Sequence, residues 1–169
     1  LQTTDELQEK IFQSAQNSRG TYQDMAEMVA KLGVNAKDAF KSSDQIVKFG
    51  ENMNKIFKLG GASSAEQSAG MLQLTQALAS GKLQGDEFRS ITENAPELIG
   101  ILAEKLGKTR SEIKQMSTDG ELTSDVIVNA VLDSTDKINS QFATMPLTWA
   151  DVWTNIKNTT LKATQPILD

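Results

Sequence analysis

Residues 63–81 have the sequence SSAEQSAGMLQLTQALASG, which contains the local signals of a complete α-helix. Ser63 and Glu66 have the spacing of a capping box, in which each side chain accepts a hydrogen bond from the other residue's amide. The apolar residues assigned to this helix are Ala69, Leu72, Leu78 and Ala79. Gly81 follows, and glycine readily adopts the left-handed conformation of a helix end. The stretch therefore predicts one helix with a defined start and stop.

Similar start and stop signals recur along the whole chain. Further capping pairs are Thr21 with Asp24, Ser42 with Gln45, Thr109 with Glu112, and Thr148 with Asp151. Further glycine stops are Gly20, Gly33, Gly60-Gly61, Gly107 and Gly120. Apolar residues at helical spacing lie between these signals, and no segment shows the alternation of a half-buried strand. The sequence predicts an all-α fold, a multi-helix bundle of about eight or nine short to medium helices.

Some of the predicted helix boundaries depend on single residues. A short helix is expected at residues 36–41, after a helix that ends at Gly33. One longer helix beginning at residue 123 or 124 is expected to run through Phe142, because its apolar residues keep one helical period. The last helix is expected to end before Pro166, since proline interrupts a helix.

The glycine breaks also predict the shape of the molecule. A continuous helix of 169 residues would be roughly 250 Å long. Repeated breaks favour a folded bundle with a radius of gyration of about 15 Å instead. We expect residues 1–169 to form a single helical domain, with a division into residues 1–60 and 61–169 as the alternative. Because the sequence begins with Leu1 rather than Met, we interpret it as a segment of a longer protein.

The composition argues against several classes of function. The chain has no Cys and no His, which excludes disulfides, thiol nucleophiles and the commonest general base. A zinc site would have to use carboxylates alone, and a net charge of -5 disfavours contact with nucleic-acid phosphate. No apolar run approaches the roughly 20 residues that cross a bilayer. We therefore expect no cofactor, no metal, no direct nucleic-acid partner and no membrane contact by this segment.

Three patterns resemble catalytic motifs, and each has a simpler structural explanation. The pair Asp86-Glu87 is typical of a first helical turn, where the helix dipole favours acids. Ser111 and Lys114 have Ser-x-x-Lys spacing, but the serine falls in a capping segment rather than at a strand-to-helix turn. Residues 81–85 are glycine-rich without the Gly-Lys-Ser/Thr of a phosphate loop. No residue is assigned a catalytic role, and we do not expect an enzyme.

Trp149 and Trp153 are four positions apart and share one face of the last predicted helix. The simpler interpretation is that this large apolar pair packs into the core. The alternative is an exposed docking surface for a partner or for the rest of a longer protein. The sequence leaves both interpretations open.

A series of ordered short motifs extends over nearly the whole chain. They are Ser18 to Tyr22, Ala62 to Gln67, Gln73 to Glu87, Glu93 to Pro96, Ala103 to Gly107, Asp119 to Thr123, Asn129-Ala130 and Phe142 to Trp149. Together they resemble the tape-measure domain of long-tailed phages and prophages. Structural roles are expected for the motif positions Gly81, Leu83, Gly85, Asp86, Glu87, Ala95, Pro96, Gly120, Met145, Pro146 and Trp149.

The resemblance implies a structural function in the phage tail. Proteins of this family set tail length, scaffold tail assembly and leave the tail during DNA ejection. The implied partners are the tail tube protein, the tail assembly chaperones and the tail tip proteins. The implied locations are the virion tail and, during assembly, the host cytoplasm. The alternative function is a helical adaptor unrelated to tails, which binds partner helices through Trp149 and Trp153.

Overall fold

The computed structural model describes residues 4–168, and side chains are described for residues 4–164. Its elements are α1 (Thr4–Asn17), α2 (Tyr22–Asn35), the 3-10 helix η1 (Lys37–Ala39), α3 (Ser43–Leu59), α4 (Ser64–Ser80), α5 (Gly85–Asn94), α6 (Pro96–Leu106), α7 (Arg110–Thr118), α8 (Ser124–Asp133), α9 (Thr135–Ala143) and α10 (Trp149–Leu168). Within this described range, the β-type pairing consists of one isolated bridge between Lys82 and Thr123. The all-α prediction is confirmed. Residues 1–3 and 169 of the predicted domain lie outside the described range.

The predicted number of helices is wrong, because residues 4–168 form ten α-helices. The helix expected to run through Phe142 is divided at Ser134 into α8 and α9. The Ser134 hydroxyl donates to the Ala130 carbonyl at 2.7 Å, and the Thr135 hydroxyl donates to the Leu132 carbonyl at 2.6 Å. Such side-chain bonds compete with the backbone ladder and bend helices. One apolar stripe therefore continues over two helices.

Three other predicted boundaries differ from the structure. α2 continues through Gly33, since a helix tolerates an isolated glycine at a cost of about 1 kcal/mol. The short helix expected at residues 36–41 is a single 3-10 turn, η1. α10 continues past Pro166 and ends two residues later at Leu168, because proline has a φ that a helix allows and costs only one backbone hydrogen bond so near the helix end.

Hydrogen bonds confirm the predicted helix starts. Reciprocal capping boxes form between Ser63 and Glu66, between Thr109 and Glu112, and between Thr148 and Asp151. Thr21 and Ser42 each accept one bond from an amide in the first turn of their helices. The backbone amide of the cap residue lowers the pKa of Glu66 and of Glu112. These boundaries are therefore set by local chemistry.

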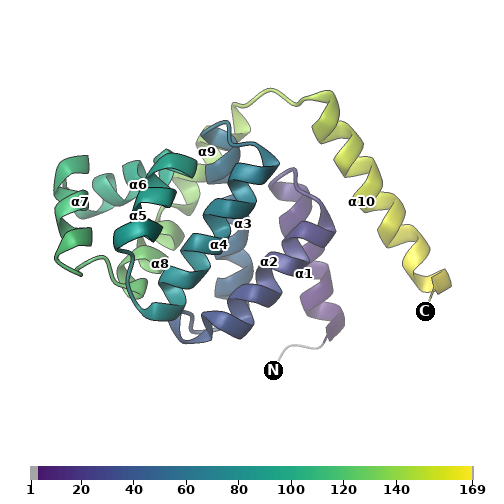
Figure 1. The fold of residues 1–169 in the computed structure, drawn as a ribbon. Coiled ribbons are helices and arrows are strands. Elements are labelled where there is room, and N and C mark those ends of the chain that lie inside the picture. Colours follow the sequence, from purple (N-terminus) through teal and green to yellow (C-terminus); the bar gives the residue numbers. More distant parts are fainter. Residues whose placement is uncertain (1–3, 169) are drawn as a thin grey trace.

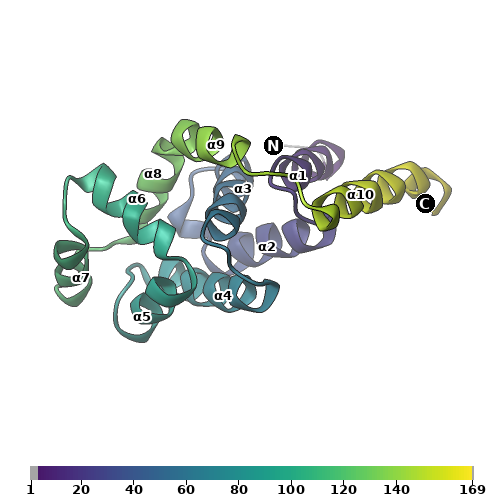
Figure 2. The same cartoon turned by 90° about the horizontal axis from the view of Figure 1, so that it is seen from above.

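α3 is the central helix of the bundle (Figures 1 and 2). It packs against α1, α2, α6, α8 and α9. Its side chains Phe49, Met53 and Phe57 are fully buried, as the helical period predicts. One cluster of buried residues extends from Ile11 on α1 to Ile138 on α9. α10 lies outside this cluster, at the edge of the bundle (Figure 1).

The buried face of α4 differs from the predicted one. Of the predicted apolar residues only Leu78 is buried, and Leu72 is 52% exposed. The residues buried on α4 are Gly70, Met71, Leu74, Thr75, Ala77 and Leu78. A Cβ atom at Gly70 would lie 2.7 Å from the Phe57 ring, so this glycine leaves room for the Phe57 side chain of α3. Apolar residues surround most of α4, and the helical period alone therefore does not identify its packed face.

Candidate interaction surface

The candidate motif residues of the α4–α5 loop lie at helix ends. Gly81 ends α4 with a φ of 98°, in the left-handed region where a side chain would be strained. Gly85 begins α5, and Asp86 and Glu87 lie in its first turn. The Asp86 carboxylate forms an exposed ion pair with Arg89 at 2.7 Å. These acids are placed to interact with the α5 dipole.

The α4–α5 loop is bonded to the loop between α7 and α8. Leu83 is fully buried and donates its amide to the Leu122 carbonyl at 2.8 Å. The Leu83 carbonyl accepts from the Ser117 hydroxyl at 3.0 Å, and the Ser124 amide donates to the Gly81 carbonyl at 2.9 Å. Two motif segments that are distant in sequence therefore meet in one loop pair.

Other motif positions also connect helices. Gly120 turns the chain after α7 with a φ of 72°. Ala95 is buried between α5 and α6, and Pro96 is the first residue of α6. The Arg110 guanidinium at the start of α7 donates to the Pro96 carbonyl at 3.1 Å. These positions link α5, α6 and α7 to one another.

The three patterns considered for catalysis lie on the surface. The Asp86 side chain is 87% exposed, and Ser111 and Lys114 are exposed as well. A fully solvated carboxylate has no environment that adapts it to general acid catalysis. Within residues 4–168, no group of three or more acidic side chains is placed to hold a metal ion. In the same range, no helix has the length and apolarity needed to span a bilayer.

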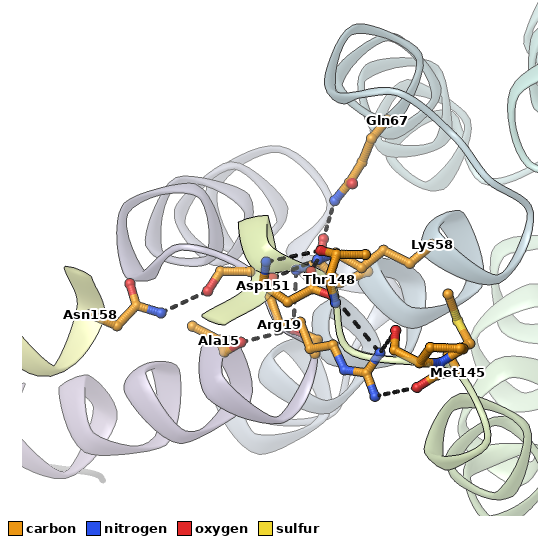
Figure 3. Close-up of polar contacts among 12 residues, drawn as sticks. Ala15, Arg19, Lys58, Gln67, Met145, Thr148, Asp151 and Asn158 are labelled. Carbon is orange, nitrogen blue, oxygen red and sulfur yellow. Dashed lines mark hydrogen bonds and ion pairs between the residues drawn. The ribbon is translucent and has the colours of Figure 1, made fainter. Parts of the chain in front are cut away.

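A group of polar side chains joins α10 to α3 and to the turn between α1 and α2 (Figure 3). We call this group the polar clasp, and it consists of Arg19, Lys58, Asp151 and Asn158. The Arg19 guanidinium donates to the carbonyls of Met145 at 3.0 Å and Pro146 at 3.3 Å. It also lies 4.5 Å from the ring centroid of Phe142. Arg19 therefore fixes the segment that leads from α9 into α10.

Asp151 lies between two cations of the polar clasp. Its carboxylate is 3.4 Å from the Lys58 ammonium and 3.9 Å from the Arg19 guanidinium. It also accepts a hydrogen bond from the Thr148 amide at 3.0 Å. Lys58 in turn donates to the Arg19 carbonyl at 2.5 Å. One carboxylate thus caps α10 and ties its first turn to α3.

Asn158 holds the middle of α10 against the bundle. This buried side chain donates to the Gly20 carbonyl at 2.7 Å and accepts from the Tyr22 amide at 2.9 Å. One turn further on, the Lys162 ammonium pairs with the Glu9 carboxylate at 2.7 Å. The contacts between α10 and the bundle are therefore largely polar.

The two tryptophans of α10 lie on the side of the helix away from the bundle. Trp149 is 89% exposed and Trp153 is 60% exposed, so the interpretation of this pair as core packing is wrong. Asn158 follows Trp149 by nine positions, which places it about 180° around the helix. A surface helix normally turns its apolar side inward. In α10 the two largest apolar side chains lie outside instead, which leaves the predicted docking surface accessible.

A cleft of about 650 Å³ lies between α10 and the bundle. Lys55 and Glu51 of α3 lie in it as an ion pair at 3.1 Å, and Lys55 also donates to Asn139 at 2.7 Å. Phe142 and Ile156 line its apolar part. Arg19 and Asp151 also line the cleft and pair with each other at 3.9 Å, so its four charged side chains form two pairs of opposite sign.

Sequence reasoning did not identify Arg19, Lys58 or Asn158 as important residues. A signal was nevertheless present, because Arg19 and the segment containing Met145 belong to two of the ordered motifs. The structure brings these two segments into direct contact. Motif segments that lack a local explanation are thus candidates for long-range contacts.

The polar clasp is expected to weaken at acid pH. Burial raises the pKa of Asp151, but hydrogen bonds from Thr148 and the charge and hydrogen bond of Lys58 lower it more, so the net pKa is depressed. Because the pKa of Asp151 is lower in the folded chain than in the unfolded chain, its ionised carboxylate stabilises the docked helix above about pH 4. This stabilisation is lost as the pH falls through the pKa that Asp151 has in the folded chain. Both tryptophans of the chain lie on α10, so tryptophan anisotropy should decrease between pH 5 and pH 3.

The variant Asp151→Asn should show a low anisotropy that no longer depends on pH in this range. Glu27→Gln is a matched control, because Glu27 forms an exposed ion pair with Lys31 on α2. An unchanged acid transition in Asp151→Asn would show that other carboxylates control α10. Far-UV circular dichroism at each pH would separate release of α10 from unfolding of the whole chain.

Comparison with known proteins identifies the family of the chain. A family model described as tape measure protein matches residues 1–167. No curated protein and no solved structure matches the chain. The matched region includes the linked loops and the polar clasp described above.

Proposed function

Because the chain belongs to the tape measure protein family, we propose that it forms a folded structural domain within a longer phage-tail protein. In this proposal the whole protein sets tail length, scaffolds tail assembly and leaves the tail during DNA ejection. The domain itself acts through contacts rather than catalysis, in keeping with the structural role of the family.

The observation that supports this proposal is that the helices are packed into a bundle rather than joined in a rod. The longest helix, α10, has 20 residues and is therefore only about 30 Å long. A segment of this shape contributes far less length than the roughly 250 Å of a continuous helix. We infer that the domain is carried by the length-determining protein and acts during assembly or at the tail tip. To enter and leave a tube it must rearrange or unfold.

We also propose that residues 1–169 form one domain rather than two. The core cluster crosses the alternative boundary at residues 60–61, since buried residues of α3 and α8 belong to the same cluster. α3 also packs against α6, α8 and α9, which lie beyond that boundary. A separate unit of residues 1–60 would expose this apolar surface to water.

The proposed partners are the tail tube protein, the tail assembly chaperones and the tail tip proteins. The proposed locations are the virion tail and, during assembly, the host cytoplasm. Neither nucleic-acid binding nor membrane contact is proposed for this segment, whose net charge is -5.

A second candidate function is a helical adaptor that binds partner helices and has no role in tails. The exposure of Trp149 and Trp153 is the observation that favours it. The two functions differ in what the flanking sequence should contain. Hundreds of residues with helical heptads are expected around a tape-measure domain, whereas an adaptor is expected to have a short multidomain context.

An in-frame deletion of residues 1–169 from the phage gene tests the proposal. We expect the tails to keep nearly their normal length and the particles to lose infectivity, because the bundle adds little to the extended length of the length-determining protein. Electron microscopy of purified particles and plaque counts give the two readouts. An equally long deletion within a continuous helical segment of the same protein is the control, and it should shorten the tail. If the first deletion shortened the tail in proportion to the number of residues removed, the proposal would be contradicted, because the segment would then contribute to tail length as an extended helix does.

A further inference from the structure

The turn between α1 and α2 is held from two sides. Towards α10, the Gly20 carbonyl and the Tyr22 amide bond to the Asn158 side chain at 2.7 and 2.9 Å. Towards the centre of the bundle, two side chains of α3 bond to the same turn, Asn54 and Lys58. The turn therefore stands between the central helix and the helix at the edge of the molecule.

Asn54 forms a buried hydrogen bond with the turn. Its carboxamide donates to the Ser18 hydroxyl at 3.1 Å, and this hydroxyl donates to the Ser14 carbonyl at 2.7 Å. Asn54 is 2% exposed and Ser18 is fully buried. A Cβ atom at Gly20 would lie 2.7 Å from Nδ2 of Asn54, so the Asn54 side chain also packs directly on the turn. Asn54 thus determines where the turn lies relative to α3.

The backbone of the turn needs this support at Arg19. Arg19 has a φ of 58°, and a side chain in this left-handed region persists only when the surrounding structure imposes the conformation. The Lys58 ammonium donates to the Arg19 carbonyl at 2.5 Å, and the Gly20 amide donates to the Ala15 carbonyl at 2.9 Å. These contacts hold the turn in the conformation in which the Arg19 side chain and the Gly20 carbonyl reach α10 and the segment before it.

The series of hydrogen bonds continues from Asn54 to α4. The oxygen of the Asn54 carboxamide accepts from the carboxamide of Gln67, a partly exposed residue near the start of α4. A carboxamide that is bonded through both its oxygen and its nitrogen is held in one orientation. Gln67 and Asn158 lie at the two ends of this series, with the turn between them (Figure 3).

We propose that Gln67, Asn54, Ser18 and Asn158 form a relay through which the start of α4 controls the docking of α10. Gln67 orients the Asn54 carboxamide, Asn54 places the turn, and the turn presents the groups that bind Asn158. α10 is the element that changes position, since it lies outside the core cluster. Thermodynamic linkage requires the reverse effect, so release of α10 must weaken the bond between Gln67 and Asn54. This inference does not rest on the proposed function.

Hydrogen exchange of the 169-residue chain, measured by mass spectrometry, tests the relay from its α4 end. Gln67→Ala should speed exchange of the α10 amides at least about threefold while those of α3 stay protected. Gln73→Ala is the matched control, because Gln73 is also a partly exposed glutamine of α4 but lies about 120° further around the helix. The control should leave α10 unchanged.

Two results of this experiment would overturn the proposal. Equal exchange of α10 in the two glutamine variants would show that Gln67 does not act on α10. Faster exchange throughout the chain in Gln67→Ala would show that Gln67 supports the whole bundle and not the docking of α10.

The middle of the relay is tested with two buried asparagines of α3. Asn54→Ala breaks the relay, whereas Asn52→Ala removes bonds to Val131 of α8 and Thr135 of α9. Both variants should lower the stability of the bundle, but only Asn54→Ala should speed exchange of α10 relative to that of α3. An equal ratio of α10 to α3 exchange in the two variants would contradict the relay.

Nuclear magnetic resonance of the isotope-labelled chain tests the reverse effect. Asn158→Ala removes the bonds between α10 and the turn, and the side-chain amide signals of Asn54 and Gln67 should shift in response. The signals of Asn52 should stay in place. Asn155→Ala is the matched control, because Asn155 is an exposed asparagine of the same helix, and it should shift none of them. Unchanged Asn54 and Gln67 signals in Asn158→Ala would overturn the proposal.

Discussion

Leu83→Ala is expected to lower the free energy of unfolding by about 3–5 kcal/mol, the upper part of the range for a buried leucine. Leu83 is fully buried, and its backbone is bonded on both sides, to Leu122 and to Ser117. A backbone held in this way cannot move to fill the cavity that the substitution leaves. Urea unfolding followed by circular dichroism measures the change.

The control for this prediction is Leu72→Ala on the adjacent helix. Leu72 is half exposed, so its truncation should change the free energy of unfolding by less than about 0.5 kcal/mol. Equal effects of the two substitutions would contradict the packing of the α4–α5 loop described above. A large difference would support the burial of Leu83 between the two loops, in keeping with a structural role at this motif position.

Arg19→Gly is expected to release α10 while the rest of the bundle stays folded. Arg19 has a φ of 58°, a left-handed conformation that glycine adopts freely, so the turn itself should be preserved. The substitution removes the hydrogen bonds to Met145 and Pro146 and the contact with Asp151. Since a hydrogen bond to a charged group contributes about 1.5–3 kcal/mol, opening of α10 should increase roughly 10- to 100-fold.

Hydrogen exchange measured by mass spectrometry can detect this opening. A released helix of 20 residues is marginally stable in water, so its amides should exchange faster while those of α3 remain protected. Arg89→Gly is the control, because Arg89 forms only an exposed ion pair. Unchanged exchange in α10 would mean that Asn158 and Lys162 hold the helix without Arg19. Faster exchange throughout the chain would mean that the substitution unfolds the bundle.

The local chemistry of the helix ends was predictable from the sequence. The pair Ser63 and Glu66 is seen as a reciprocal capping box because its hydrogen bonds lie within one turn and need no distant residue. The buried side of α3 was predictable for a related reason. Its apolar residues recur at helical spacing and are buried together, whereas the burial of Asn52, Asn54 and Lys55 on the same helix depends on the surrounding helices.

Features that depend on distant residues were not predictable in this way. α4 is apolar around most of its surface, and its packed side depends on other helices, through its packing against α5 and α2 and the contact of Gly70 with Phe57 of α3. In α10 the sequence identified the apolar stripe but not its surroundings. The inward position of Asn158 depends on partners from α2 and from the turn between α1 and α2, which no pattern within α10 can reveal.

The antiparallel arrangement of α1 and α10 determines how this protein responds to mechanical tension. The two helices run in opposite directions, and their free ends lie on the same side of the molecule (Figure 1). A pulling force on the flanking chain therefore loads their contacts one after another, beginning with the pair Glu9–Lys162 and ending at Arg19 and Asp151. Contacts that are loaded one after another break at a lower force than contacts that bear the load together. α10 should therefore peel away first and act as an extensible segment of about 30 Å before the central helices bear any load.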